Sequence, residues 1–221
     1  MILVHEDMQK EAEHVASRLQ EVYNIPAFLV NQDLKNLFTP IQSFPGFFYS
    51  HLNLKNQFFK EFHNNSVFVL TSRDLYIADK DRNDDWIFGY RWANLTVVTN
   101  ARMKRKDSQP SSDLQIPFET YLKRLDFLSI HEVGHDLVKA KHHKNAQWVN
   151  VKTNYTMELG QHCTDNKCVM YEIVDIKAPP ISEGHMLLGD EKRYDAGLDD
   201  LLERIYPDWF CSKCREAISV S

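Results

Sequence analysis

The chain has 221 residues, a formal net charge of −5 and 43% hydrophobic residues. This length fits one sizeable domain, and the hydrophobic content is enough for a core. The mildly acidic balance argues against a general nucleic-acid-binding protein. The short apolar start and the lack of a membrane-length apolar run predict a soluble, cytoplasmic protein without membrane partners.

Helical patterns and short apolar runs alternate through the first half of the chain. Apolar residues recur at helical spacing in residues 8–23, and a second helix is expected in residues 53–65. Residues 33–53, which contain Pro40 and Pro45, are expected to form mostly loop. Short apolar runs that predict strands occupy residues 26–30, 66–72, 85–91 and 95–101. This alternation favours an α/β or α+β fold, in which helices cover a twisted, mixed or parallel sheet.

A long amphipathic helix is expected after Pro117, a residue that suits the first turn of a helix. It carries the sequence H-E-V-G-H at residues 131–135. Histidines four apart lie on one face of a helix, so His131 and His135 can bind the same metal ion. Glu132 lies about 100° around the helix axis. From there it can take a proton from a zinc-activated water that attacks a carbonyl.

The four cysteines form two close pairs, Cys163 with Cys168 and Cys211 with Cys214. In a reducing compartment such pairs more often hold zinc than form disulfides. Thiolates a few residues apart can point at one ion, and two such turns complete a tetrahedron. The spacing therefore predicts a structural zinc held by all four thiolates. Free thiols, or a redox pair in C-S-K-C, are the alternatives.

Residues 162–170 read H-C-T-D-N-K-C-V-M, a histidine and a cysteine followed by C-x4-C and C-x-M spacing. Together with the H-E-V-G-H helix and the later C-S-K-C, this segment resembles the archaemetzincins, a family of metzincin-type zinc metalloproteases. The T-S-R-D-L-Y and F-G-Y segments and the strands around them also resemble that family. The similar blocks cover under half of the chain, approximately residues 66–105, 118–137, 162–170 and 211–214.

The resemblance implies a zincin-like fold whose active-site helix carries the HExxH motif, with a four-cysteine zinc subdomain at the C-terminus. It implies a catalytic zinc held by three histidines, His131, His135 and His162. Glu132 would be the general base, and Met170 would form the methionine turn beneath the ligands. A second, structural zinc at the cysteines brings the expected cofactors to two zinc ions. Tyr171, next to Met170, either lines the cleft or packs beneath the site.

Two spacings depart from the family pattern. His162 follows His135 by 27 positions, where the family has six, so residues 138–161 are an insertion. The other candidates for the third ligand are Glu158, His142 and His185. The histidines of the K-H-H-K run, residues 141–144, are expected to be solvated. A second insertion lies between Met170 and the C-terminal C-S-K-C, where it can shape the substrate side of the cleft.

The leading hypothesis is a single zincin-like catalytic domain, residues 1–221, that hydrolyses peptide or protein substrates. It would contain the sheet and active-site helix in 1–137, the insertion in 138–161 and the C-terminal metal-binding part in 162–221. An endopeptidase and an aminopeptidase are both compatible with the motifs. The alternative is a non-catalytic zinc-binding scaffold that keeps the metal sites. The retained Glu132 favours the enzyme, because a purely structural zinc has no use for a base there.

Overall fold

The computed structural model describes residues 1–34, 38–40, 47–49, 65–77, 86–106, 115–152, 154–173, 175–177, 182, 184–193 and 197–218. Of the helix expected in residues 53–65, residues 53–64 lie outside this part of the chain. The chain packs into two compact units. One comprises Met1–Lys104 and Leu128–Glu132, and the other comprises Arg105–Phe127 and Val133–Ser221. Helix α3 (Phe118–Leu137) is continuous and contributes residues to both.

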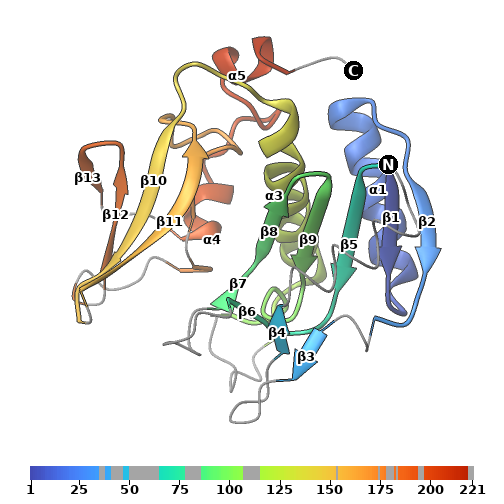
Figure 1. Cartoon of the computed structure of the whole chain (residues 1–221). Coiled ribbons are helices and arrows are strands. Elements are labelled where there is room, and N and C mark those ends of the chain that lie inside the picture. Colours follow the sequence, from blue (N-terminus) through green and yellow to red (C-terminus); the bar gives the residue numbers. More distant parts are fainter. Residues whose placement is uncertain are drawn as a thin grey trace. The chain divides into compact units, whose positions relative to one another are not determined.

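The first unit is built on a five-stranded mixed sheet with strand order β2-β1-β5-β9-β8 (Figure 1). Strands β2, β1, β5 and β9 are parallel, and β8 joins the edge antiparallel to β9. Their bounds are Ile2–His5 (β1), Phe28–Asn31 (β2), Val67–Thr71 (β5), Gly89–Trp92 (β8) and Leu95–Thr99 (β9). Every residue of β5 and β9 is buried, as expected for central strands of a parallel sheet.

Helix α1 (Gln9–Tyr23) packs against β1 and β2 and buries Ala12, Val15 and Leu19. It confirms the helix that the apolar spacing predicts. The first unit also contains a small sheet of order β3-β4-β6-β7. Its strands are Phe38–Pro40 (β3), Phe47–Tyr49 (β4), Leu75–Ile77 (β6) and Trp86–Ile87 (β7). Two of these strands therefore lie in the segment expected to be mostly loop.

The second unit contains a four-stranded antiparallel sheet of order β11-β10-β12-β13. The strands are Lys144–Asn150 (β10), Tyr155–His162 (β11), Gly184–Leu188 (β12) and Glu191–Arg193 (β13). Two short helices follow, Leu198–Leu202 (α4) and Ser212–Glu216 (α5). Both insertions inferred from the sequence thus contribute a pair of strands to the same sheet.

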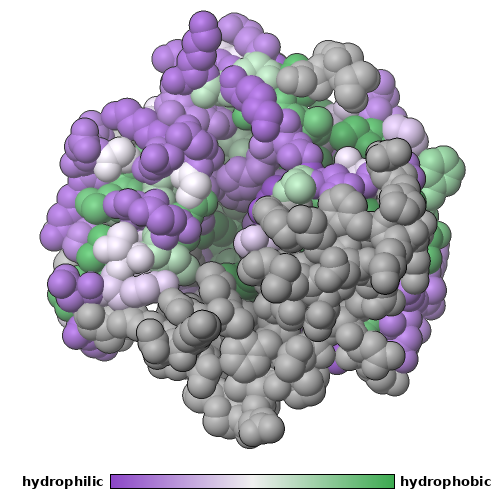
Figure 2. All heavy atoms as spheres, viewed as in Figure 1, coloured by the Kyte–Doolittle hydropathy of each residue, from purple (hydrophilic) through white to green (hydrophobic). Residues whose placement is uncertain are grey.

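Helix α3 ends at Leu137 although the sequence contains no stop signal there. Val138 adopts an extended conformation, and its backbone forms a bridge to Ile218 near the C-terminus. The helix thus ends where the chain pairs with a remote segment. None of the helices in the described residues is long and apolar enough to cross a membrane. Hydrophilic residues cover most of the coloured surface on the face shown in Figure 2.

Candidate metal centres

Three histidines come together although one of them is far away in the sequence. His131 and His135 lie one turn apart on α3, and His162 is the last residue of β11. The β10–β11 register pairs His162 with Lys144 at the start of β10. Since β10 begins shortly after α3 ends, the hairpin returns the chain to this point. Ligand nitrogens of the three histidines lie within 4.8 Å of one another.

The geometry of this histidine group suits a zinc ion. The rings of His135 and His162 meet edge to face, with centroids 4.8 Å apart. His131 and His162 are buried, with 4% and 1% of their surfaces exposed. Three nitrogens bound to one tetrahedral zinc at 2.0–2.1 Å would lie about 3.4 Å apart. Small side-chain movements would therefore bring these nitrogens to ligand positions.

Both ring nitrogens of His162 face hydrogen-bond acceptors. Nδ1 lies 3.2 Å from the backbone oxygen of Gly160, and Nε2 contacts the carboxylate of Glu172. A backbone carbonyl is held by its strand, whereas a glutamate side chain can move. The Gly160 contact therefore holds a proton on Nδ1 and leaves Nε2 as the nitrogen available to a metal. Sequence reasoning missed Glu172, whose only signal is its position two residues after Met170.

Glu132 lies beside strand β8 of the first unit and is 8% exposed. A Cβ atom at Gly89 would lie 2.5 Å from Oε1 of Glu132. The missing side chain at Gly89 therefore provides the space that the Glu132 carboxylate occupies. Arg91 follows on the same strand. Burial lowers the pKa of the Arg91 guanidinium to about 10, and the nearby Glu132 carboxylate opposes this shift. The carboxylate of Glu132 thus lies close to the β8 backbone, with the half-buried Arg91 guanidinium nearby.

Met170 and Tyr171 are buried in the turn that follows His162, with 0% and 2% of their surfaces exposed. The backbone N–H of Cys163 donates to the oxygen of Met170 at 2.8 Å. The N–H of Tyr171 donates to the oxygen of Cys168 at 3.0 Å. These bonds close a compact turn that directly follows His162 and contains the first cysteine pair.

The four cysteines also come together. All four are buried free thiols, and their Sγ atoms lie within 4.8 Å of one another. The Sγ atoms of Cys163 and Cys211 are 3.8 Å apart. Two thiolates on one tetrahedral zinc are also about 3.8 Å apart. Cys211 caps the N-terminus of α5, where its Sγ accepts from the N–H of Cys214 at 3.4 Å. This donor set fits a structural zinc.

Close packing of the thiols shifts their proton affinities in opposite directions. Hydrogen bonds from Cys163 and Cys214 lower the pKa of Cys168 to about 2. The hydrogen bond to Cys168 raises the pKa of Cys163, and the one with Cys163 raises the pKa of Cys214. Within the cluster, Cys168 therefore loses its proton most easily, and Cys163 and Cys214 keep theirs as hydrogen-bond donors. A divalent cation can replace those protons.

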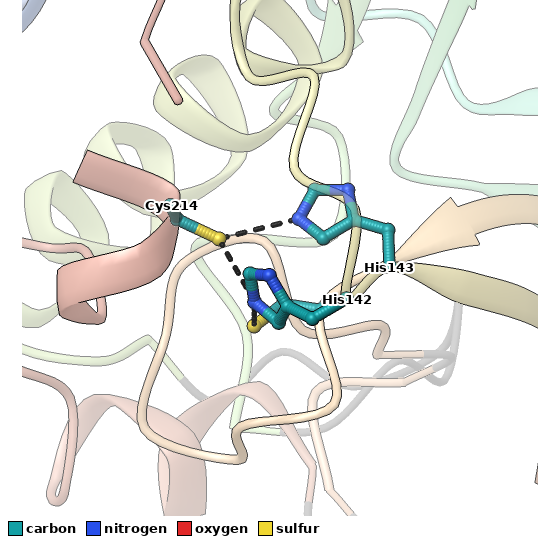
Figure 3. A group of neighbouring side chains, drawn as sticks. His142, His143 and Cys214 are labelled. Atoms are coloured by element: carbon teal, nitrogen blue, oxygen red, sulfur yellow. Dashed lines mark hydrogen bonds between the residues drawn. The ribbon is translucent and has the colours of Figure 1, made fainter. Parts of the chain in front are cut away.

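Two further histidines belong to the cysteine cluster (Figure 3). His142 Nε2 lies 3.1 Å from Cys163 Sγ, and His143 Nε2 lies 3.2 Å from Cys214 Sγ. The expectation that these side chains are solvated is therefore wrong. Their position follows from the strand register: pairing of Lys144 with His162 brings the residues before Lys144 close to Cys163. The local sequence pattern does not reveal this hairpin or its register, so it could not place the two histidines.

The other third-ligand candidates lie elsewhere in the second unit. Glu158 lies on the exposed side of β11 and accepts a hydrogen bond from Gln147. His185 lies on β12, opposite Val149 of β10. Among the described residues, the metal-binding group that contains His131 and His135 includes neither of them.

No protein-family model matches the chain, and no curated protein matches it in sequence. Its structure is similar to the crystal structure of a zinc-dependent peptidase from Methanocorpusculum labreanum (strain Z), with a TM-score of 0.53 and 16% sequence identity. The similarity covers 99% of this chain and 99% of the other chain. At this identity the likeness shows the fold. The chain therefore combines the fold of a zinc-dependent peptidase with groups of residues able to bind metal.

Proposed function

We propose that the protein is a zinc-dependent peptidase of metzincin type, related to the archaemetzincins. In this proposal His131, His135 and His162 hold the catalytic zinc. The observation that carries it is the approach of His162 to two histidines on α3 across a 27-position separation in sequence. Three imidazoles on one ion leave a fourth position open, as in catalytic rather than structural zinc sites.

The chain's own groups prepare this site for an ion. Helix α3 presents His131 and His135 on one face. The carbonyl of Gly160 accepts from Nδ1 of His162, so Nε2, which faces Glu172, is the nitrogen that would bind a metal. Metal binding at Nε2 would require release of the proton shared with Glu172 and loss of that contact. The site would therefore exchange one ionic contact for a metal ligand.

Glu132 is the general base in this mechanism. When bound, zinc lowers the pKa of a water molecule toward about 7 and polarises a peptide carbonyl. Glu132 takes the proton from the attacking water and returns it to the leaving amine. Gly89 lets the β8 backbone lie against this carboxylate. Among the described strands β8 pairs only with β9, so an extended substrate can pair with its other edge.

The four cysteines hold a structural zinc in the same proposal. Cys163 directly follows His162, so an ion at the cysteines also limits where His162 points. Residues 1–221 act as one zincin-like catalytic domain, because α3 contributes to both compact units. The substrates are peptides or proteins of the cytoplasm.

Glu132→Gln tests the mechanism. We expect hydrolysis of a peptide library to fall about 10²- to 10⁴-fold, because the general base is lost, while zinc content stays unchanged. Glu158→Gln, which alters an exposed carboxylate on β11, is the matched control and should retain activity. Wild-type hydrolysis by Glu132→Gln would contradict the proposed mechanism.

One observation favours the alternative of a non-catalytic zinc scaffold. Glu172 contacts the nitrogen of His162 that a catalytic zinc would use. If this carboxylate stayed at the ion as a fourth ligand, no open position would remain for water. A wild-type protein that binds zinc at the histidines but hydrolyses no member of the library would support the scaffold.

A further inference from the structure

Two groups of potential metal ligands overlap in the second unit. One consists of the four cysteines, Cys163, Cys168, Cys211 and Cys214. The other consists of two histidines and two of the same cysteines, His142, His143, Cys163 and Cys214. Within each group the ligand atoms lie within 4.8 Å of one another. A single tetrahedral ion takes only four of these six donors, so one structural zinc leaves the two histidines without a ligand role.

We propose that this cluster binds two zinc ions that share the thiolates of Cys163 and Cys214. Cys168 and Cys211 complete the coordination of one ion, and the two histidines complete that of the other. Two tetrahedra with a common edge require six donor atoms, which is the number that the cluster supplies. The second ion is additional to the structural zinc proposed above, and its binding does not depend on peptidase activity.

The histidine rings already face the shared sulfurs. The two shortest distances from His142 Nε2 are 3.1 Å to Cys163 Sγ and 3.5 Å to Cys214 Sγ, with Cys211 Sγ at 3.6 Å. His143 Nε2 lies 3.2 Å from Cys214 Sγ. Figure 3 shows both rings directed at this sulfur. A nitrogen and a sulfur on one tetrahedral zinc are about 3.6 Å apart. The distances from the histidine nitrogens to the two shared sulfurs, 3.1, 3.5 and 3.2 Å, are therefore within about half an ångström of this value.

The charge of the cluster supports a second ion. Four thiolates around one divalent ion carry an excess of two negative charges. Two divalent ions with the same four thiolates and two neutral imidazoles carry none. Cys163, Cys168 and Cys214 are completely buried and Cys211 is 6% exposed. Because burial penalises an uncompensated charge, the neutral cluster is favoured.

The ligand positions follow from secondary structure on both sides of the cluster. The turn before β10 carries the two histidines and is closed by a hydrogen bond from His143 N–H to the oxygen of Ala140 at 3.0 Å. Pairing of β10 with β11 then sets this turn beside Cys163. On the other side, the hydrogen bond from Val169 N–H to the oxygen of Trp209, at 2.7 Å, connects the two cysteine turns. Backbone contacts therefore bring the six donors together.

Zinc content per chain tests the proposal directly. The measurement uses the full-length chain carrying His131→Ala and His135→Ala, which removes the proposed catalytic zinc. We expect two zinc ions per chain in this variant, and one after His142→Ala and His143→Ala are added. As a matched control, adding His14→Ala and His185→Ala, which lie outside the metal-binding groups, should leave two. One zinc before removal of His142 and His143 would overturn the proposal, with the histidines then acting as hydrogen-bond donors to the thiolates. Two zinc ions after their removal would overturn it as well.

Cadmium NMR tests the sharing of the sulfurs. With isotopically enriched cadmium in the His131→Ala, His135→Ala variant, we expect two cadmium resonances coupled to each other through the common thiolates. A single resonance, or two without coupling, would overturn the proposal. The protein used for this spectrum keeps all six donors. The spectrum therefore decides the question even if the variant lacking His142 and His143 fails to fold. Failure of the peptidase proposal would appear in the hydrolysis assay and would change neither the spectrum nor the zinc count.

Discussion

The histidine group and the cysteine cluster use the backbone in different ways. The histidines lie on regular elements, two on the 20-residue helix α3 and one at the end of β11. The cysteines lie on turns and on α5, a helix of only five residues. A long helix and a hairpin form their own hydrogen bonds, whereas a helix of five residues is unstable by itself. With zinc at both sites as proposed, we therefore expect the first site to keep its structure without metal and the second to depend on its metal more strongly.

The largest effect should come from metal removal. A chelator should loosen residues 163–173, 175–177 and 197–218, because structural zinc sites contribute on the order of 10 kcal/mol to folding. Helix α3 and the β10–β11 hairpin should keep most of their protection. Hydrogen exchange with and without the chelator, resolved by segment, measures the difference. Equal loss of protection in α3 and the cysteine turns would remove the distinction between the two sites.

A smaller effect should follow from Arg124→Met, which breaks an anchor that contains no metal. Arg124 on α3 is 1% exposed and donates to both carboxylate oxygens of Asp199 on α4, at 2.7 and 2.6 Å. Its Nη1 also donates to the oxygen of Arg105 at 2.6 Å. Asp199 is 34% exposed and can be rehydrated, so we expect a cost of about 2 kcal/mol. The melting temperature should fall by roughly 4–8 °C while zinc content is unchanged.

Arg215→Met is the control for this change. Arg215 pairs with Asp208, but both side chains are at least half exposed. Exposed ion pairs contribute about 0–1 kcal/mol. Equal melting temperatures for the Arg124 and Arg215 variants would show that the Arg124 pair does not anchor α3 to α4. Zinc loss in the Arg124 variant would show that the cysteine cluster depends on this anchor.

The smallest effect on stability should come from Gly89→Ala, which probes how the histidine site is prepared. The new Cβ would lie 2.5 Å from Oε1 of Glu132 and must displace that carboxylate. Because the displaced atoms belong to a flexible side chain, we expect a cost of about 1 kcal/mol, the low end of the range for overpacking. A displaced base should nevertheless reduce kcat about 10- to 100-fold. Unchanged kcat, measured at wild-type zinc content, would show that β8 does not position Glu132.

Much of the first unit could be predicted from the sequence. The buried runs of β5 and β9 and the apolar stripe of α1 are local patterns, and they form the expected elements. The spacing of His131 and His135 likewise predicts neighbouring side chains on one helix. The β10–β11 hairpin could not be predicted from the same patterns. Most of its strand residues are exposed or only partly buried, and only Ala146 and His162 in its two strands are fully buried.

The sequence by itself determined the helix with its two histidines and the two cysteine pairs, because local spacing decides which side chains share a turn. Only the tertiary structure decided which remote residues join them. The β10–β11 register brought His162 to α3 and placed His142 and His143 at the cysteines. The turn after Met170 brought Glu172 to His162. Strand register and burial depend on contacts between distant segments, so no pattern within one segment specifies them.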